Sequence, residues 1–122
     1  MRAIVEGICY SLYQVAGSIE DTIGPIKNIY ASGGFIRSGE WLQMIADVFN
    51  KPVKVMKTSD ASAVGAAILG LYAMEILKNL SEASSFFSVG ETIFPDKQNH
   101  ICYDKNFRIY DTLYDRLKDA FV

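Results

Sequence analysis

Residues 30–41 of this 122-residue chain hold the pattern best suited to binding a ligand. The sequence Tyr-Ala-Ser-Gly-Gly-Phe-Ile-Arg-Ser-Gly-Glu-Trp places an apolar strand, a glycine pair and a helix start in succession. Gly33 and Gly34 have no Cβ atoms to block a ligand, and the N–H groups of a helix start can face it. Ser38 lies at the first turn of that helix. The pattern predicts close approach of the backbone to a flat or phosphorylated ligand, although many α/β proteins use such a pair only to turn.

The elements that position this turn follow from the spacing of apolar residues. A helical pattern covers residues 4–19, and Gly24-Pro25 breaks the chain before a strand at 26–31. A helix over 38–49 and a strand over 53–56 complete a βαβ unit with two parallel strands. The expected apolar positions of the two helices are Ile4, Ile8, Leu12, Val15 and Ile19, and then Trp41, Leu42, Ile45, Ala46 and Phe49.

The second half predicts two more helices and a loop. Thr58, Ser59 and Asp60 offer N-cap chemistry for a helix over 61–80, whose small residues 65–67 suggest close packing on the sheet. Residues 84–102 show no periodicity and are expected to form an extended loop. An amphipathic terminal helix follows and is expected to pack on its own fold through Tyr103, Phe107, Tyr110, Tyr114, Leu117 and Phe121.

Composition excludes several classes of protein. Half of the residues are hydrophobic, 21% are charged and the net charge is −2, which is ordinary for a globular domain and unlike a nucleic-acid-binding surface. The longest uncharged stretch, 61–74, is too short for a bilayer span, which takes about 20 residues. Cys9 and Cys102 have no metal-ligand spacing and are interpreted as reduced thiols of a cytoplasmic protein. No partner among nucleic acids or membranes is therefore expected.

Two parallel strands are too few for an independent domain, because parallel sheets have more strands and are covered on both faces. We therefore expect the chain to be part of a larger sheet whose earlier strands lie before Met1. An open sheet edge and uncovered apolar helix faces predict self-association of the chain on its own.

Several motifs in order resemble one protein family. Ala-Ser-Gly-Gly-Phe-Ile-Arg-Ser at 31–38, Trp-Leu-Gln-Met-Ile-Ala-Asp-Val at 41–48, Pro52-Val53, and Asp60 leading into Val-Gly-Ala-Ala at 64–67 look like the C-terminal half of the FGGY carbohydrate kinases. The resemblance covers nearly the whole chain. Gly-Gly-Phe-x-Arg-Ser and Trp-x-Gln-Met-x-Ala-Asp look most like gluconokinases, whereas xylulokinases tend toward Gly-Gly-Gly-Ala at the turn.

The resemblance implies an α/β fold, namely part of an actin-like ATPase (ribonuclease H-like) domain over residues 1–122. It implies ATP and Mg²⁺ as cofactors of the full-length enzyme, with sugar bound mainly by an N-terminal domain that this sequence lacks. Gly33, Gly34 and Phe35 would line the adenine side, and Ser38 would supply a hydroxyl toward the base or ribose. No residue here matches the family's catalytic base or its phosphate-binding loops, and no metal ligand is expected.

These features lead to one leading hypothesis and two alternatives. The leading hypothesis is the C-terminal portion of an ATP-dependent kinase that phosphorylates gluconate to 6-phosphogluconate, inactive on its own. The alternatives are a xylulose, other pentulose or polyol kinase, and a non-catalytic nucleotide-binding or interaction module. Asp47 is expected to be a structural acid, Asp60 a helix cap and Trp41 a core residue, while Ser38 could cap the helix, contact the ligand or do both.

Overall fold

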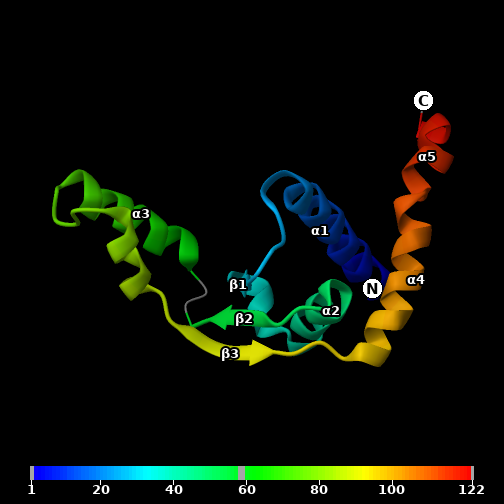
Figure 1. Cartoon of the computed structure of the whole chain (residues 1–122), viewed down its shortest axis with the longest axis horizontal. Coiled ribbons are helices and arrows are strands. Elements are labelled where there is room, and N and C mark those ends of the chain that lie inside the picture. Colours follow the sequence, from blue (N-terminus) through cyan, green and yellow to red (C-terminus); the bar gives the residue numbers. More distant parts are fainter. Residues whose placement is uncertain (1, 58–59, 122) are drawn as a thin grey trace.

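A computed structural model describes residues 2–57 and 60–121, with the side chains of all but the last of these (Figure 1). Three short strands and several helices alternate along the chain. Their order is α1 (Arg2–Ile23), β1 (Ile29–Ala31), a 3₁₀ turn η1 (Gly34–Arg37), α2 (Gly39–Phe49), β2 (Val53–Met56), α3 (Ala61–Ala73), η2 (Leu80–Phe86), β3 (Val89–Ile93), α4 (Lys97–Asp111), α5 (Leu113–Leu117) and η3 (Lys118–Phe121). The predicted helix–βαβ–helix order is confirmed.

The three strands form one sheet in the order β1-β2-β3. β1 and β2 are parallel, with Ile29 opposite Val53 and Ala31 opposite Val55, as predicted. β3 runs antiparallel to β2, which Figure 1 shows as two neighbouring arrows of opposite direction. The expected extended loop over 84–102 is therefore wrong. The strand formed by Val89–Ile93 is largely exposed, so it shows no apolar alternation, and its pairing with β2 decides its conformation.

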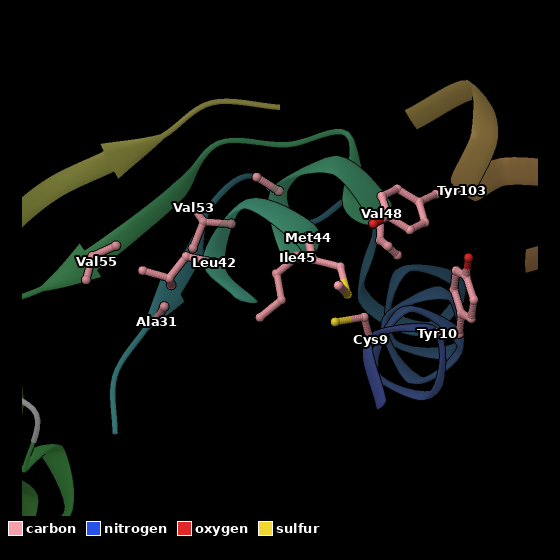
Figure 2. Packing of buried hydrophobic residues seen from close by; sticks show 11 residues of the cluster. Cys9, Tyr10, Ala31, Leu42, Met44, Ile45, Val48, Val53, Val55 and Tyr103 are labelled. Carbon is pink, nitrogen blue, oxygen red and sulfur yellow. The ribbon is translucent and has the colours of Figure 1, made fainter. Parts of the chain in front are cut away.

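α2 lies at the centre of the main hydrophobic core. Leu42, Ile45 and Ala46 are buried as predicted, whereas Trp41 and Phe49 are only half-buried. Figure 2 shows side chains of α2 between the sheet, represented by Ala31 and Val53, and the helices on the other side. Because Met44, Asp47 and Val48 are buried too, α2 is enclosed on nearly every side rather than along one stripe.

α1 packs through a different side from the one that its apolar spacing indicates. Cys9, Tyr10 and Ala16 are buried, and Tyr13 packs against the same core. The predicted apolar positions are all exposed: Ile4, Ile8, Leu12, Val15 and Ile19. α1 is thus apolar on two sides, and aromatic contacts with α4 determine which of them faces this core. The rings of Tyr13 and Phe107 lie 4.8 Å apart.

α3 is shorter than predicted and lies away from the sheet. It ends at Ala73 rather than near residue 80, and the chain then turns through Glu75, whose φ is 59°. A Cβ atom at Gly65 would have no neighbour within 4 Å, so the expected close packing of residues 65–67 on the sheet is wrong. Instead, α3 packs with η2 in a second small cluster, Ile68, Leu77 and Ala83, at the end of the molecule opposite α4 (Figure 1).

The terminal helix is confirmed in part. α4 begins at Lys97, earlier than predicted, and Asp96 caps it by accepting hydrogen bonds from the N–H groups of the next turn. Tyr103 is buried and Phe107 and Tyr110 pack against the core, but Tyr114 is 74% exposed. The expectation that Tyr114 packs within the chain is wrong, because the helix is interrupted at Thr112 before α5 begins. The predicted contribution of Phe121 and the cap residues 58 and 59 lie outside the described side chains.

Candidate functional site

The turn after β1 needs glycine at one position and leaves space at the other. Gly33 has φ 98° and ψ −177°, a backbone conformation that residues other than glycine rarely adopt. Gly34 has no positive φ, and a Cβ atom built there would meet nothing within 4 Å. The fold therefore does not require glycine at position 34. Its missing side chain leaves open space beside the backbone, as close approach of a ligand would require.

Phe35 connects this turn to the core. Its ring is half-buried and lies 5.5 Å from the ring of Trp41, with the two planes tilted by 51°. Both rings pack against the main core. Trp41 packs against the core as predicted, although it is only half-buried. Phe35 holds the turn in place from inside, and any ligand contact through its ring stays a prediction.

Ser38 caps α2, which confirms one of its two expected roles. Its Oγ accepts a hydrogen bond from the Trp41 N–H at 3.3 Å and donates one to Glu40 Oε2 at 3.1 Å. The pKa of the Glu40 carboxyl is lowered by hydrogen bonds that it accepts from the Glu40 backbone N–H and from the Ser38 hydroxyl. Ser38 is half-buried, so a ligand could replace Glu40 as the acceptor of its hydroxyl without loss of the cap.

A pocket of about 730 Å³ opens beside Ser38, between the start of α1, one side of α2 and the first turns of α4. Its lining combines apolar, aromatic and amide side chains with two hydroxyls, two carboxylates and one guanidinium: Arg2, Val5, Ser38, Gly39, Glu40, Trp41, Gln43, Met44, Asp47, Asn99 and Tyr103. Of the four predicted site residues, Ser38 alone lines this pocket. Gly33, Gly34 and Phe35 lie along the turn that precedes it.

The pocket wall is held by hydrogen bonds between distant segments. Arg2 donates to the Tyr103 hydroxyl at 3.1 Å and to Glu6 Oε1 at 2.9 Å. No sequence pattern indicates Asn99 or Tyr103 as pocket residues, because their position depends on how α4 packs on α1 and α2. Asp96 is a residue type that commonly caps helices, but it lies in the segment 84–102, which is expected from the sequence to form a loop.

Asp47 is the most buried charged residue of the site, with 2% exposure. Its Oδ1 accepts from the Asp96 N–H at 2.7 Å and from Gln43 Nε2 at 2.8 Å, and its Oδ2 accepts from Asn99 Nδ2 at 3.0 Å. His100 Nδ1 lies 2.9 Å from the Asp47 carbonyl oxygen. The expectation of a structural acid is confirmed: Asp47 fixes the start of α4 to α2.

The structure gives no ligand-binding role to Asp60, Arg37, Cys9 or Cys102. Asp60 accepts from the Ala63 N–H at 3.3 Å, as predicted for a cap, and Arg37 is exposed. Cys9 and Cys102 are both free thiols, and burial raises the pKa of Cys9 to about 11. Within residues 2–57 and 60–121 no group of three or more His, Cys, Asp or Glu side chains is placed to hold a metal ion. In the same part of the chain, no helix is long and apolar enough to cross a membrane.

Comparisons with known proteins agree on one family. Residues 1–74 match the family described as "FGGY family of carbohydrate kinases, C-terminal domain". A gluconokinase of Bacillus subtilis (strain 168) is 45% identical over 74 residues, 60% of this chain and 14% of that protein. A xylulose kinase of Staphylococcus epidermidis is 33% identical over 118 residues, 96% of this chain and 24% of that protein.

A solved structure extends the likeness to the fold. The gluconate kinase of Lactobacillus acidophilus superimposes with a TM-score of 0.81 at 32% identity, over 95% of this chain and 24% of that protein. The predicted fold class is confirmed. The chain spans about a quarter of the length of two of these relatives. By sequence and by fold, the chain belongs to the FGGY family of carbohydrate kinases, as a form of their C-terminal domain.

Proposed function

We propose that residues 1–122 form the C-terminal, nucleotide-side portion of a cytoplasmic, ATP-dependent carbohydrate kinase. The reaction is transfer of the γ-phosphoryl group of ATP to a hydroxyl of gluconate, giving 6-phosphogluconate. One observation carries the nucleotide assignment: Gly34, whose φ does not require glycine and whose missing Cβ leaves open space, lies between the strained Gly33 and the helix cap Ser38. Other glycines of the chain have open space too, so it is this place in the turn, in a chain of a kinase family, that supports room for a ligand.

The residues of the turn fit an adenosine group. Gly33 supplies the backbone conformation, Gly34 the clearance and Phe35 the support from the core. The Ser38 hydroxyl can turn from Glu40 toward a polar atom of the base or ribose while its oxygen still accepts from Trp41. ATP bound there would supply the phosphoryl group for transfer.

The described part of the chain has no group of three or more His, Cys, Asp or Glu side chains placed to hold a metal ion, and the resemblance to the family matches no phosphate-binding loop here. We therefore assign the triphosphate and Mg²⁺, together with the general base and the sugar pocket, to an N-terminal portion of the working enzyme. Phosphoryl transfer depends on positioning and on charge stabilisation, so neither portion is expected to catalyse it alone.

Gluconate is favoured over other substrates by the turn and its flanks. Identity to the Bacillus subtilis gluconokinase reaches 45% over a stretch of 74 residues, against 33% over 118 residues for the Staphylococcus epidermidis xylulose kinase. Xylulose or another pentulose is the second candidate, because xylulose kinases match over nearly the whole chain. A polyol substrate, or a module that binds nucleotide without catalysis, would be compatible with the same fold.

A pair of chimeric enzymes tests this function. The chain would replace the matching quarter of the Lactobacillus acidophilus gluconate kinase, and in parallel that of the Staphylococcus epidermidis xylulose kinase. We expect ATP-dependent phosphorylation of gluconate by the first chimera at a rate well above that of the same kinase lacking its C-terminal quarter. A folded first chimera without turnover would favour the non-catalytic module. Because the sugar pocket comes from the host enzyme, turnover by the second chimera alone would show that this chain works only with the N-terminal portion of a xylulose kinase, which would favour xylulose.

A further inference from the structure

The Ser38 hydroxyl has two hydrogen-bond partners whose polarity is fixed. Its oxygen lies 3.3 Å from the backbone nitrogen of Trp41, which can only donate, and 3.1 Å from Glu40 Oε2. The pKa of the Glu40 carboxyl lies below its ordinary value of 4.5, so at neutral pH this group is ionised and can only accept. The proton of the Ser38 hydroxyl is therefore directed to Glu40, and Trp41 takes one lone pair of its oxygen.

The position that stays available on the Ser38 oxygen is an acceptor. A hydroxyl has one proton and two lone pairs, and within the described residues this oxygen makes no hydrogen bond besides those to Trp41 and Glu40. A ligand that donates to Ser38 can use the second lone pair and breaks no existing bond. A ligand that accepts from Ser38 must displace an ionised carboxylate, whose hydrogen bonds are about twice as strong as neutral ones.

We propose that Glu40 is a positioning residue for base selection, which holds the Ser38 hydroxyl as an acceptor for the 6-amino group of adenine. This inference rests on the proposed function, which places adenosine beside Ser38. Adenine presents a donor at this position, whereas guanine and hypoxanthine present a carbonyl oxygen, which can only accept. Ribose hydroxyls both donate and accept, so a fixed acceptor would add nothing to their selection.

The surroundings of Glu40 allow it this role. Glu40 and Ser38 both line the pocket of about 730 Å³, so the carboxylate lies on the side from which a ligand reaches the hydroxyl. A carboxylate in the first turn of α2 also stabilises the positive end of that helix. This second effect changes stability but not the choice between two bases, so base preference is the property that separates the two roles.

Glu82 offers a matched control at the start of another helical turn. It is exposed, lies in the first turn of η2 and is bound to its own cap residue, since Asn79 Nδ2 donates to Glu82 Oε1 at 3.0 Å. Glu82 does not line the pocket beside Ser38. Glu82→Ala therefore removes a comparable carboxylate without touching the Ser38 hydroxyl.

Calorimetric binding of ADP and of inosine diphosphate to the gluconate kinase chimera tests the proposal without turnover. We expect the parent chimera to prefer ADP, and Glu40→Ala to reduce the ratio of the two dissociation constants by about fivefold, as for the loss of one hydrogen bond. The two nucleotides carry the same phosphates, so removal of the Glu40 charge affects both constants alike and cancels in the ratio. Glu82→Ala should leave the ratio unchanged.

Two further variants test whether Glu40 acts through Ser38. Glu40→Gln keeps an acceptor oxygen and should retain part of the preference for ADP. In a chimera that already carries Ser38→Ala, Glu40→Ala should change the ratio no further. Far-UV circular dichroism verifies the fold of each variant, and Ser38→Gly, which preserves a helix cap better than alanine, replaces Ser38→Ala if that variant does not fold.

The outcomes separate this inference from the proposed function. A chimera that binds ADP but shows no preference over inosine diphosphate would overturn the inference alone. So would a ratio that Glu40→Ala leaves unchanged, or one that Glu82→Ala lowers as much as Glu40→Ala does. A folded chimera that binds neither nucleotide would contradict the proposed function, and the inference would fall with it.

Discussion

Gly33 and Gly34 are neighbours in one turn, yet the fold constrains them differently. We predict that Gly33→Ala lowers the free energy of unfolding by about 1–3 kcal/mol, because its φ of 98° forces an L-residue into a strained region. Gly34→Ala should change it by less than about 0.5 kcal/mol, since the added methyl group meets nothing within 4 Å. Urea unfolding followed by the fluorescence of Trp41 measures both. Equal losses would mean that position 34 is constrained by the fold after all.

Asp47 supports a prediction of the opposite kind, in which a buried side chain is indispensable. Asp47→Asn keeps the shape of the side chain but replaces one of its two acceptor oxygens by an NH₂ donor. That donor then faces either the donor of Asn99 or the two donors of Asp96 and Gln43. The expected loss is about 2–4 kcal/mol, because hydrogen bonds to a charged group are broken and a buried donor loses its partner. Asp115→Asn, on an exposed residue, is the control and should cost less than about 0.5 kcal/mol.

At the scale of elements, Glu20 ties α1 to the connections that follow it. Its carboxylate accepts from Lys51 Nζ at 2.5 Å and from the Ile26 N–H at 2.8 Å. These two hydrogen bonds, that from Lys51 first, lower the pKa of Glu20 below its ordinary value of 4.5. A carboxyl whose pKa is lower when folded stabilises the protein above its unfolded pKa, and this stabilisation is lost as the pH falls through the folded pKa.

The resulting prediction concerns acid unfolding. Wild type should be more stable than Glu20→Gln at pH 7, and the difference should shrink below pH 4.5 until it vanishes once Glu20 is protonated in both states. Urea midpoints measured for both proteins across this range provide the test. A difference that stays constant down to strongly acidic pH would show that the substitution acts through packing rather than through the charge.

The elements also show what the sequence can and cannot predict. α2 and β2 can be predicted from the sequence because apolar spacing and the break at Asn50-Lys51-Pro52 are local signals. Asn50 adopts a left-handed φ of 50°, as expected at the end of a helix. β3 is not readable, since it is exposed and depends on pairing with β2. Apolar spacing locates α1 but not its packed side, because both sides are apolar.

The same distinction applies to the candidate site. Gly33 and Ser38 are predictable because a φ requirement and a helix cap depend on neighbours within a few residues. The pocket beside Ser38 is not, because Arg2 and Tyr103 reach it from opposite ends of the chain. Asp47 could be identified as structural, but its donors on α4 could not.

The molecule as a whole has one main hydrophobic core, one small separate cluster and a large exposed apolar surface. α2 lies between the sheet on one side and α1 and α4 on the other, whereas α3 and η2 form a separate small cluster at the far end (Figure 1). Within the described residues, β1 pairs on one side only, and several large aliphatic side chains of α1 are exposed: Ile4, Ile8, Leu12, Val15, Ile19 and Ile23. This arrangement suits a portion of a larger assembly, which is the basis for assigning catalysis to two portions together.

We therefore predict that the 122-residue chain alone does not phosphorylate gluconate and binds ATP weakly. Only the adenosine side of the site is expected here, so the dissociation constant should be weaker than micromolar, which corresponds to less than about 8 kcal/mol of binding free energy. Calorimetry and an assay with ATP, Mg²⁺ and gluconate measure the two properties. Sugar phosphate above the no-protein control, or micromolar binding, would contradict the division of the site between two portions.

The central claim, that the turn at Gly34 is the adenosine side of a kinase site, is tested most directly by the kinetics of Gly34→Val in the active gluconate kinase chimera. The account predicts a rise of about tenfold or more in the apparent KM for ATP, with the KM for gluconate unchanged and the stability within about 0.5 kcal/mol of the parent, because the branched side chain enters the ligand's space rather than the protein's own. An unchanged dependence on ATP in a stable, active variant would contradict the claim and leave the glycine pair as a turn alone.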